Sequence, residues 1–120
     1  YRVIAKTDPR EFLEDSSYPV KTVRLEIGFD VEVSIDNDFY WFSWVEPERS
    51  LVLGWHQDDD HPEYGEVHFQ LDQSDSDTLR ESAEYIEKHP MAVVEARLDQ
   101  LPDVVQTVKW NNGTATGVSW

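Results

Sequence analysis

The chain has 120 residues, with 25 Asp and Glu against 10 Lys and Arg, a formal net charge of -15 and no cysteine. This length predicts one domain, and the lack of cysteine excludes a disulfide framework and thiolate chemistry. No apolar run approaches the ~20 residues of a membrane-spanning helix, and nothing at the start resembles a signal peptide. We therefore expect a cytoplasmic protein with no membrane partner.

The acidic residues are spread along the whole chain, and lysine is scarce. A compact domain with this charge repels itself in dilute buffer, and salt weakens that repulsion. The composition therefore predicts a protein from an extreme halophile, with an ordinary acidic domain as the alternative. Because an acidic surface serves solubility at high salt, it does not exclude nucleic acid as a partner.

Alternating apolar and polar residues predict most of the strands in the first part of the chain. Asp8 followed by Pro9 is typical of a helix start and predicts one helical turn. We expect a turn at residues 28–30 and a hairpin tip at residues 36–38. Short connections predict an antiparallel meander. The expected strands are residues 1–6, 20–27, 31–35, 39–45, 51–55 and 65–71.

The strand at residues 39–45 is aromatic on both faces. Tyr40, Phe42 and Trp44 share one face, and Trp41 lies on the other. An exposed aromatic face would stack on nucleic-acid bases. The alternative is that Tyr40, Phe42 and Trp44 form the core beneath the helices, which is favoured because soluble domains rarely expose large apolar patches.

Helical spacing follows, because Leu79, Ala83 and Ile86 form a stripe that begins after Asp77 and ends before Pro90. Residues 91–98 are expected to form a last strand. A second helix is expected to begin at Asp99, with Pro102 in its first turn and its end at residues 111–113. The whole pattern predicts an α+β fold, an antiparallel β-meander of about five to six strands with two helices packed on one face.

We expect residues 1–110 to form a single α+β domain and residues 111–120 to form a polar C-terminal tail. The expected core combines the inward positions of the strands with the apolar stripes of the helices. Its members are Val23, Leu25, Ile27, Val33, Ile35, Leu53, Val67, Phe69, Leu71, Leu79, Ile86, Val94, Leu98 and Val105.

The segment from Trp55 to His68 holds three of the four histidines in the chain and several carboxylates. Imidazole and carboxylate groups could together hold a metal ion. Their spacing matches neither the His-Glu-x-x-His motif nor the 12-residue calcium loop, which favours a solvated loop, no metal and no cofactor. The candidate site residues are Trp55, His56, Asp58, Asp60, His61, Glu63 and His68.

Acid–base chemistry is the other use of this segment, because a histidine beside carboxylates can hold or transfer a proton near neutral pH. Asp60 or Glu63 would orient His61. A hairpin across the loop would place His56 opposite His68. No nucleophile is singled out, so the sequence leaves open whether the protein is an enzyme.

Residues 39–44 and 51–55, the loop at 58–63 and the strand of His68 resemble the TumE-type proteins of toxin–antitoxin systems. Residues 95–105 resemble the closing strand and helix of that family. Asp60 stands where the family has a first histidine, the later histidine cluster is reduced to His68, and residues 74–90 look inserted.

The resemblance implies a toxin that acts on RNA or translation, paired with an antitoxin protein. It also implies that Trp55, Asp58, His61 and His68 converge at one mouth of the sheet. The alternative is a non-catalytic protein-interaction module.

Overall fold

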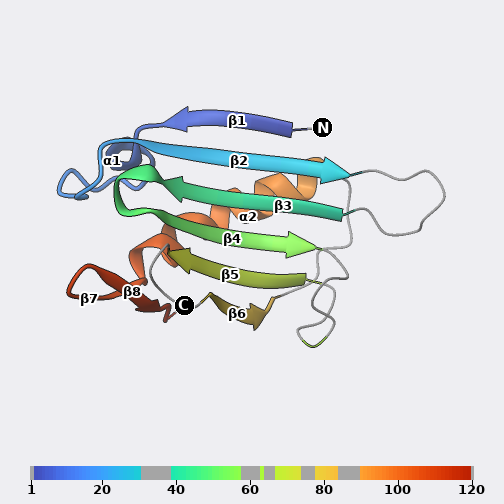
Figure 1. Ribbon diagram of the computed structural model, residues 1–120. Coiled ribbons are helices and arrows are strands. Elements are labelled where there is room, and N and C mark those ends of the chain that lie inside the picture. Colours follow the sequence, from blue (N-terminus) through green and yellow to red (C-terminus); the bar gives the residue numbers. More distant parts are fainter. Residues whose placement is uncertain are drawn as a thin grey trace.

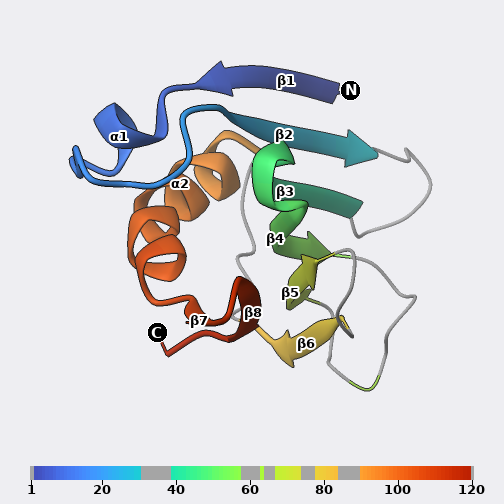
Figure 2. The ribbon, with the colours of Figure 1, turned by 60° about the vertical axis from the view of Figure 1, so that its left-hand side comes forward.

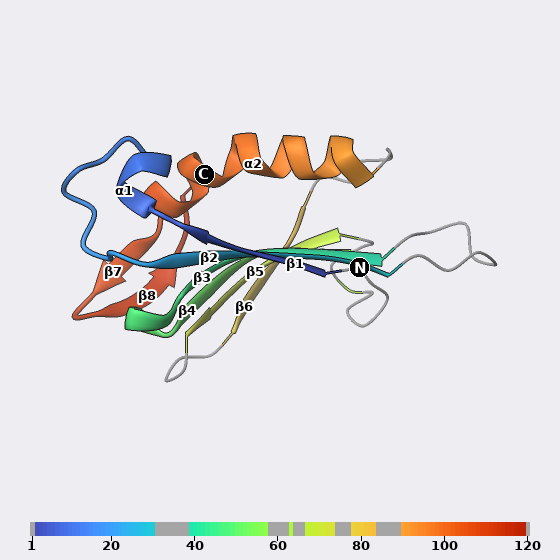
Figure 3. The same ribbon diagram turned by 90° about the horizontal axis from the view of Figure 1, so that it is seen from above.

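A computed structural model describes residues 2–30, 39–57, 63, 67–73, 78–83 and 90–119. Six antiparallel strands form one sheet in the order β1-β2-β3-β4-β5-β6 (Figure 1). Both helices lie on one side of this sheet (Figure 3). The predicted α+β meander is therefore confirmed. The sheet strands are β1 (Arg2–Thr7), β2 (Val23–Asp30), β3 (Phe39–Glu46), β4 (Leu51–Gln57), β5 (Val67–Gln73) and β6 (Leu79–Ser82). The other elements are α1 (Pro9–Phe12), the 3-10 turn η1 (Pro47–Arg49), α2 (Pro90–Gln106), β7 (Lys109–Asn111) and β8 (Thr114–Gly117).

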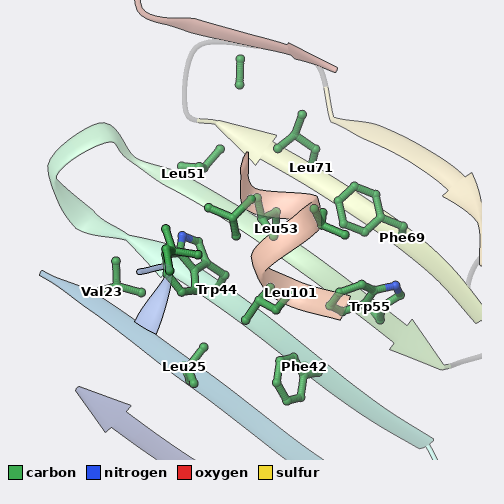
Figure 4. Packing of buried hydrophobic residues seen from close by; sticks show 14 of the residues in the cluster. Val23, Leu25, Phe42, Trp44, Leu51, Leu53, Trp55, Phe69, Leu71 and Leu101 are labelled. Atoms are coloured by element: carbon green, nitrogen blue, oxygen red, sulfur yellow. The ribbon is translucent and has the colours of Figure 1, made fainter. Parts of the chain in front are cut away.

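The strand register sorts the side chains into an inner face, toward the helices, and an outer face. One inner row runs from Leu25 through Trp44 and Leu53 to Leu71, and all four side chains are buried. Figure 4 shows them packed with residues of α2. The aromatic face of β3 is thus part of the core, which confirms the core interpretation. Predicted core residues that are buried or packed against the core are Val23, Leu25, Ile27, Leu53, Val67, Phe69, Leu71, Val94, Leu98 and Val105.

The helix α2 corrects two predictions, because the expected strand at 91–98 and the expected helix from Asp99 are one continuous helix. Four of its buried side chains, Val93, Arg97, Leu101 and Val105, recur every four residues, which is the spacing of one helical face. The charged Arg97 occupies a core position and interrupts the apolar stripe, so the sequence pattern split at that point. Pro90 at the start of the helix suits the first helical position.

The expected helix beginning near residue 77 is also wrong where the structure describes it. Residues 79–82 form the edge strand β6, in which Leu79 pairs with Leu71 of β5. Pairing with the open edge of β5 outweighs local helical spacing, since propensity is weaker than tertiary context. Leu79 is 41% exposed and is not a core residue. The other expected core residues Val33, Ile35 and Ile86 lie outside the described residues.

The turn expected at residues 28–30 is absent, because β2 continues to Asp30. Packing explains Gly28 instead: a Cβ atom at this position would overlap the indole of Trp41 on β3, so that ring would have to shift. The predicted helical turn is confirmed as α1. The Asp8 side chain accepts hydrogen bonds from the backbone N–H groups of Arg10 (3.0 Å) and Glu11 (3.4 Å). The hairpin tip expected at 36–38 lies outside the described residues.

The hairpin of β7 and β8 was not predicted, and it includes part of the expected tail at 111–120. Figure 2 shows it after the end of α2, beside the sheet. Gln73 at the end of β5 joins this hairpin to the sheet. Its side-chain oxygen accepts a hydrogen bond from the Ala115 N–H at 2.8 Å, and its side-chain nitrogen donates one to the Gly113 carbonyl at 3.2 Å.

The last residue of β3, Glu46, has a fully buried carboxylate. It accepts hydrogen bonds from the Tyr18 hydroxyl, from the Trp44 indole N–H at 2.8 Å and from Arg49 at 2.7 Å. The Arg49 guanidinium also lies 4.0 Å from the centre of the Trp110 ring. Burial, followed by the hydrogen bond to Glu46, raises the pKa of Tyr18. This network joins the segment after α1, the β3–β4 turn and the β7–β8 hairpin.

Candidate functional site

A single row of cross-strand neighbours on the outer face joins two of the candidate histidines. The register pairs Trp41 with His56 and His56 with His68. It continues to Gly28 on one side and to Ser82 on the other. These five residues are called the outer row. Among the described residues, no helix covers this face (Figure 3).

The two histidine rings of the outer row lie against each other. Their centroids are 5.2 Å apart and their planes are tilted by 33°. His68 is only 1% exposed, whereas His56 on the neighbouring inner strand β4 is partly exposed. The His68 Nε2 atom lies 3.2 Å from the Gln70 side-chain oxygen, to which it donates when it carries the proton. The accessible imidazole is therefore that of His56, with His68 held behind it.

Trp41 completes the aromatic part of the outer row. Its indole extends over Gly28, where the missing side chain leaves room for the ring. Trp41 is partly exposed, so one tryptophan and one histidine lie side by side within reach of solvent. An exposed aromatic surface of this kind can stack on a nucleobase, and an imidazole beside it can exchange a proton.

Trp55 lies on the opposite face of the sheet and corrects the expected convergence with His68. It pairs with Phe42 and Phe69 on the inner face and is fully buried. The Arg97 guanidinium carbon lies 5.0 Å from the centre of the Trp55 ring. Because side chains alternate along a strand, Trp55 and its neighbour His56 point to opposite sides. Trp55 is therefore a core residue and does not line the outer row.

Arg97 of α2 binds the inner face beneath this region. Its NH2 group donates to the Tyr40 hydroxyl at 3.1 Å, and its NH1 group donates to the Gln100 side-chain oxygen at 2.7 Å. Burial raises the pKa of Tyr40, while the Arg97 charge opposes that effect. Arg97 and Tyr40 thus position the helix on the sheet at the end where β4 stops.

Three of the candidate residues, Asp58, Asp60 and His61, lie outside the described residues. Glu63 is described and exposed. Within the described part of the chain, no group of three or more His, Cys, Asp or Glu side chains is arranged to hold a metal ion. Among the described residues, the imidazoles of His56 and His68 carry the nitrogen atoms that could bind a metal ion.

Sequence reasoning linked His56 with His68 but did not connect either of them with Trp41. The missing information was the register of β3 against β4. That register depends on the length of the turn between them, where η1 occupies three residues. Counting back from this turn pairs Trp41 with His56.

Comparison with protein-family models, with curated proteins and with solved structures finds no match for this chain. The class that the geometry defines is an α+β protein with an antiparallel meander, helices on one face and an aromatic row on the other. No helix in the described ranges is long and apolar enough to cross a membrane.

Proposed function

We propose that this protein is a toxin-like component of a toxin–antitoxin pair that acts on RNA or on translation. The observation that supports the proposal is the pairing of His56 with His68 beside Trp41 on the face of the sheet opposite α1 and α2. Trp41 would stack on a base, and His56 would exchange a proton with the bound nucleotide. His68 and Gln70 would hold the His56 ring in place.

The sequence resemblance to TumE-type proteins supports the same function, because it covers β3, β4 and β5, which carry Trp41, His56 and His68. The two histidines flank residues 57–67, which contain the remaining candidates Asp58, Asp60, His61 and Glu63. An antitoxin protein is the partner that this proposal requires. The net charge of -15 supports a cytoplasm with molar salt as its setting, since high ionic strength screens repulsion among carboxylates.

Growth after induced expression tests the proposal in a halophilic host. We expect the wild-type protein to arrest growth and the double variant Trp41→Ala with His56→Gln to relieve the arrest. Val52→Ala is the matched control, because Val52 lies on the same strand and face as His56 but outside the outer row. Circular dichroism of the purified variants checks that each one folds. Normal growth while the wild-type protein accumulates would overturn the proposal.

The alternative function is a non-catalytic interaction module, and the edge strand β1 favours it. Val3 is 57% exposed and Ile4 is 52% exposed, and among the described strands β1 pairs only with β2. An exposed apolar edge can accept a strand from another protein. Co-purification of the product of the neighbouring gene separates the two functions. Loss of this association in Val3→Lys with Ile4→Lys, without growth arrest by the wild type, would favour the interaction module.

A further inference from the structure

Three basic residues of this acidic chain line one pocket. The pocket has a volume of about 480 Å³ and is lined by Lys6, Lys21 and Arg24. The whole chain has only ten Lys and Arg, so three of the ten surround this one cavity. The remaining lining residues are Thr7, Asp8, Thr22, Val23 and Pro47.

Two of these cations are direct cross-strand neighbours. Lys6 on β1 pairs with Arg24 on β2, and residues in such positions have Cβ atoms ~4.5–5.5 Å apart. Like charges directly opposite each other destabilise a sheet. An acidic residue opposite either cation would remove this repulsion, and the chain has many acidic residues. A bound anion between Lys6 and Arg24 would turn the repulsion into attraction.

Three carboxylates near the pocket, Asp8, Glu26 and Glu48, have hydrogen-bond partners among the described residues. Asp8 accepts hydrogen bonds from two backbone N–H groups at the start of α1. Glu26 binds Arg2 at 2.7 Å and Arg24 at 3.4 Å, and Glu48 accepts from the Thr22 hydroxyl at 3.4 Å. Neither Lys6 nor Lys21 forms an ion pair with any residue in the described ranges. Two lysines therefore remain available to an anion.

We propose that this pocket binds a phosphate group carried by a small ligand. Lysine binds phosphate as a point charge, and arginine binds it through two parallel N–H groups. The volume is that of a small-molecule pocket, larger than one phosphate needs, and the exposed Pro47 adds apolar surface for the rest of the ligand. The start of β2 and the start of β5 lie at opposite ends of the sheet (Figure 1). The phosphate site is therefore separate from the outer row, and it does not depend on the proposed function.

The test is a titration of the ¹⁵N-labelled protein followed by two-dimensional NMR, with inorganic phosphate and AMP as probes. It uses the lowest KCl concentration that preserves the fold, because salt screens exposed charges. We expect saturable shifts at residues 6–8 and 21–24. Lys6→Gln with Lys21→Gln should weaken binding by at least about tenfold, as expected for lost hydrogen bonds to a charged group. Lys109→Gln is the matched control, since Lys109 is an exposed lysine on β7 outside the pocket.

The two probes distinguish the sources of the phosphate. Tighter binding of AMP than of inorganic phosphate would support a phosphate carried by a small ligand, and equal binding of the two probes would overturn that part of the proposal. Shifts without saturation would overturn the proposal, as would acetate binding as tightly as phosphate. Equal weakening in Lys109→Gln would also overturn it, because the effect would then be that of overall charge.

Discussion

His56 and His68 are direct cross-strand neighbours, with ring centroids 5.2 Å apart on the face of the sheet opposite α1 and α2. Such pairs stabilise an antiparallel sheet by roughly 0.2–1 kcal/mol. The two rings differ in burial, because His68 is 1% exposed whereas His56 is partly exposed. A double-mutant cycle separates the free energy of the ring contact from that of burying each ring.

The prediction is a positive coupling between these histidines in a double-mutant cycle. We expect His68→Ala to lower the free energy of unfolding more than His56→Ala, since it removes a buried ring. The double variant should lose less than the sum of the single losses, by about 0.2–1 kcal/mol. Denaturant unfolding of the four proteins measures this quantity. Strictly additive losses would show that the ring contact contributes nothing.

A second prediction concerns salt, because the chain carries a net charge of -15. Electrostatic repulsion extends over ~30 Å at 0.01 M salt but only ~3 Å at 1 M. We expect the midpoint of thermal unfolding to be clearly higher in molar KCl than in dilute buffer. Replacing KCl by sucrose separates screening from exclusion of cosolvent. Equal midpoints in KCl and dilute buffer would contradict adaptation to high salt.

The sequence predicts four neighbouring strands of the sheet well, because β2, β3, β4 and β5 each carry one apolar face with a period of two residues. It also predicts the facing histidines, since a hairpin across the loop after β4 places the two strand ends opposite each other. The side assigned to Trp55 was wrong because the whole loop was treated as one site. Strand alternation sends Trp55 to the core and His56 to the outer face.

The helices were harder to predict because the deciding contacts join residues far apart in the chain. Arg97 is fully buried against Tyr40 and Trp55, and no local pattern marks a charged residue as a core residue. Leu79 belongs to a strand because β5 offers it a free edge. The pocket that we propose to bind phosphate was also not predicted, because Lys6 and Arg24 become neighbours only through the β1–β2 pairing.

A third prediction tests the core. Phe69 is 1% exposed and packs edge-on against Trp55, with ring centroids 5.7 Å apart. Phe69→Ala should therefore lower the free energy of unfolding by about 3–5 kcal/mol. Val52→Ala is the control on the adjacent strand, because Val52 is 37% exposed, and it should cost less than about 1 kcal/mol. Similar losses for the two variants in denaturant unfolding would contradict the packing described.

A fourth prediction concerns the buried carboxylate of Glu46. Arg49→Ala removes its charged partner and leaves the carboxylate with the Tyr18 hydroxyl and the Trp44 indole. We expect a loss of about 3 kcal/mol, because a buried charge without its partner is costly. Adding Glu46→Gln to Arg49→Ala should recover part of that loss, since the amide carries no charge. A double variant that is less stable than Arg49→Ala would show that the charge is not what destabilises the single variant.

The last prediction is a loss of stability at alkaline pH. Burial raises the pKa of Tyr18 and that of Tyr40 above the ordinary value of 10.0. The folded protein therefore keeps both phenol protons at a pH where the unfolded chain releases them. This stabilisation is complete below pH 10 and declines as the pH rises above it.

Unfolding free energies measured from about pH 9 to about pH 11 should fall above pH 10 in the wild type. They should fall less steeply in Tyr18→Phe with Tyr40→Phe. The comparison uses slopes, because the two substitutions also remove hydrogen bonds to Glu46 and Arg97 and lower stability at every pH. Parallel slopes would show that neither buried phenol is responsible for the alkaline loss.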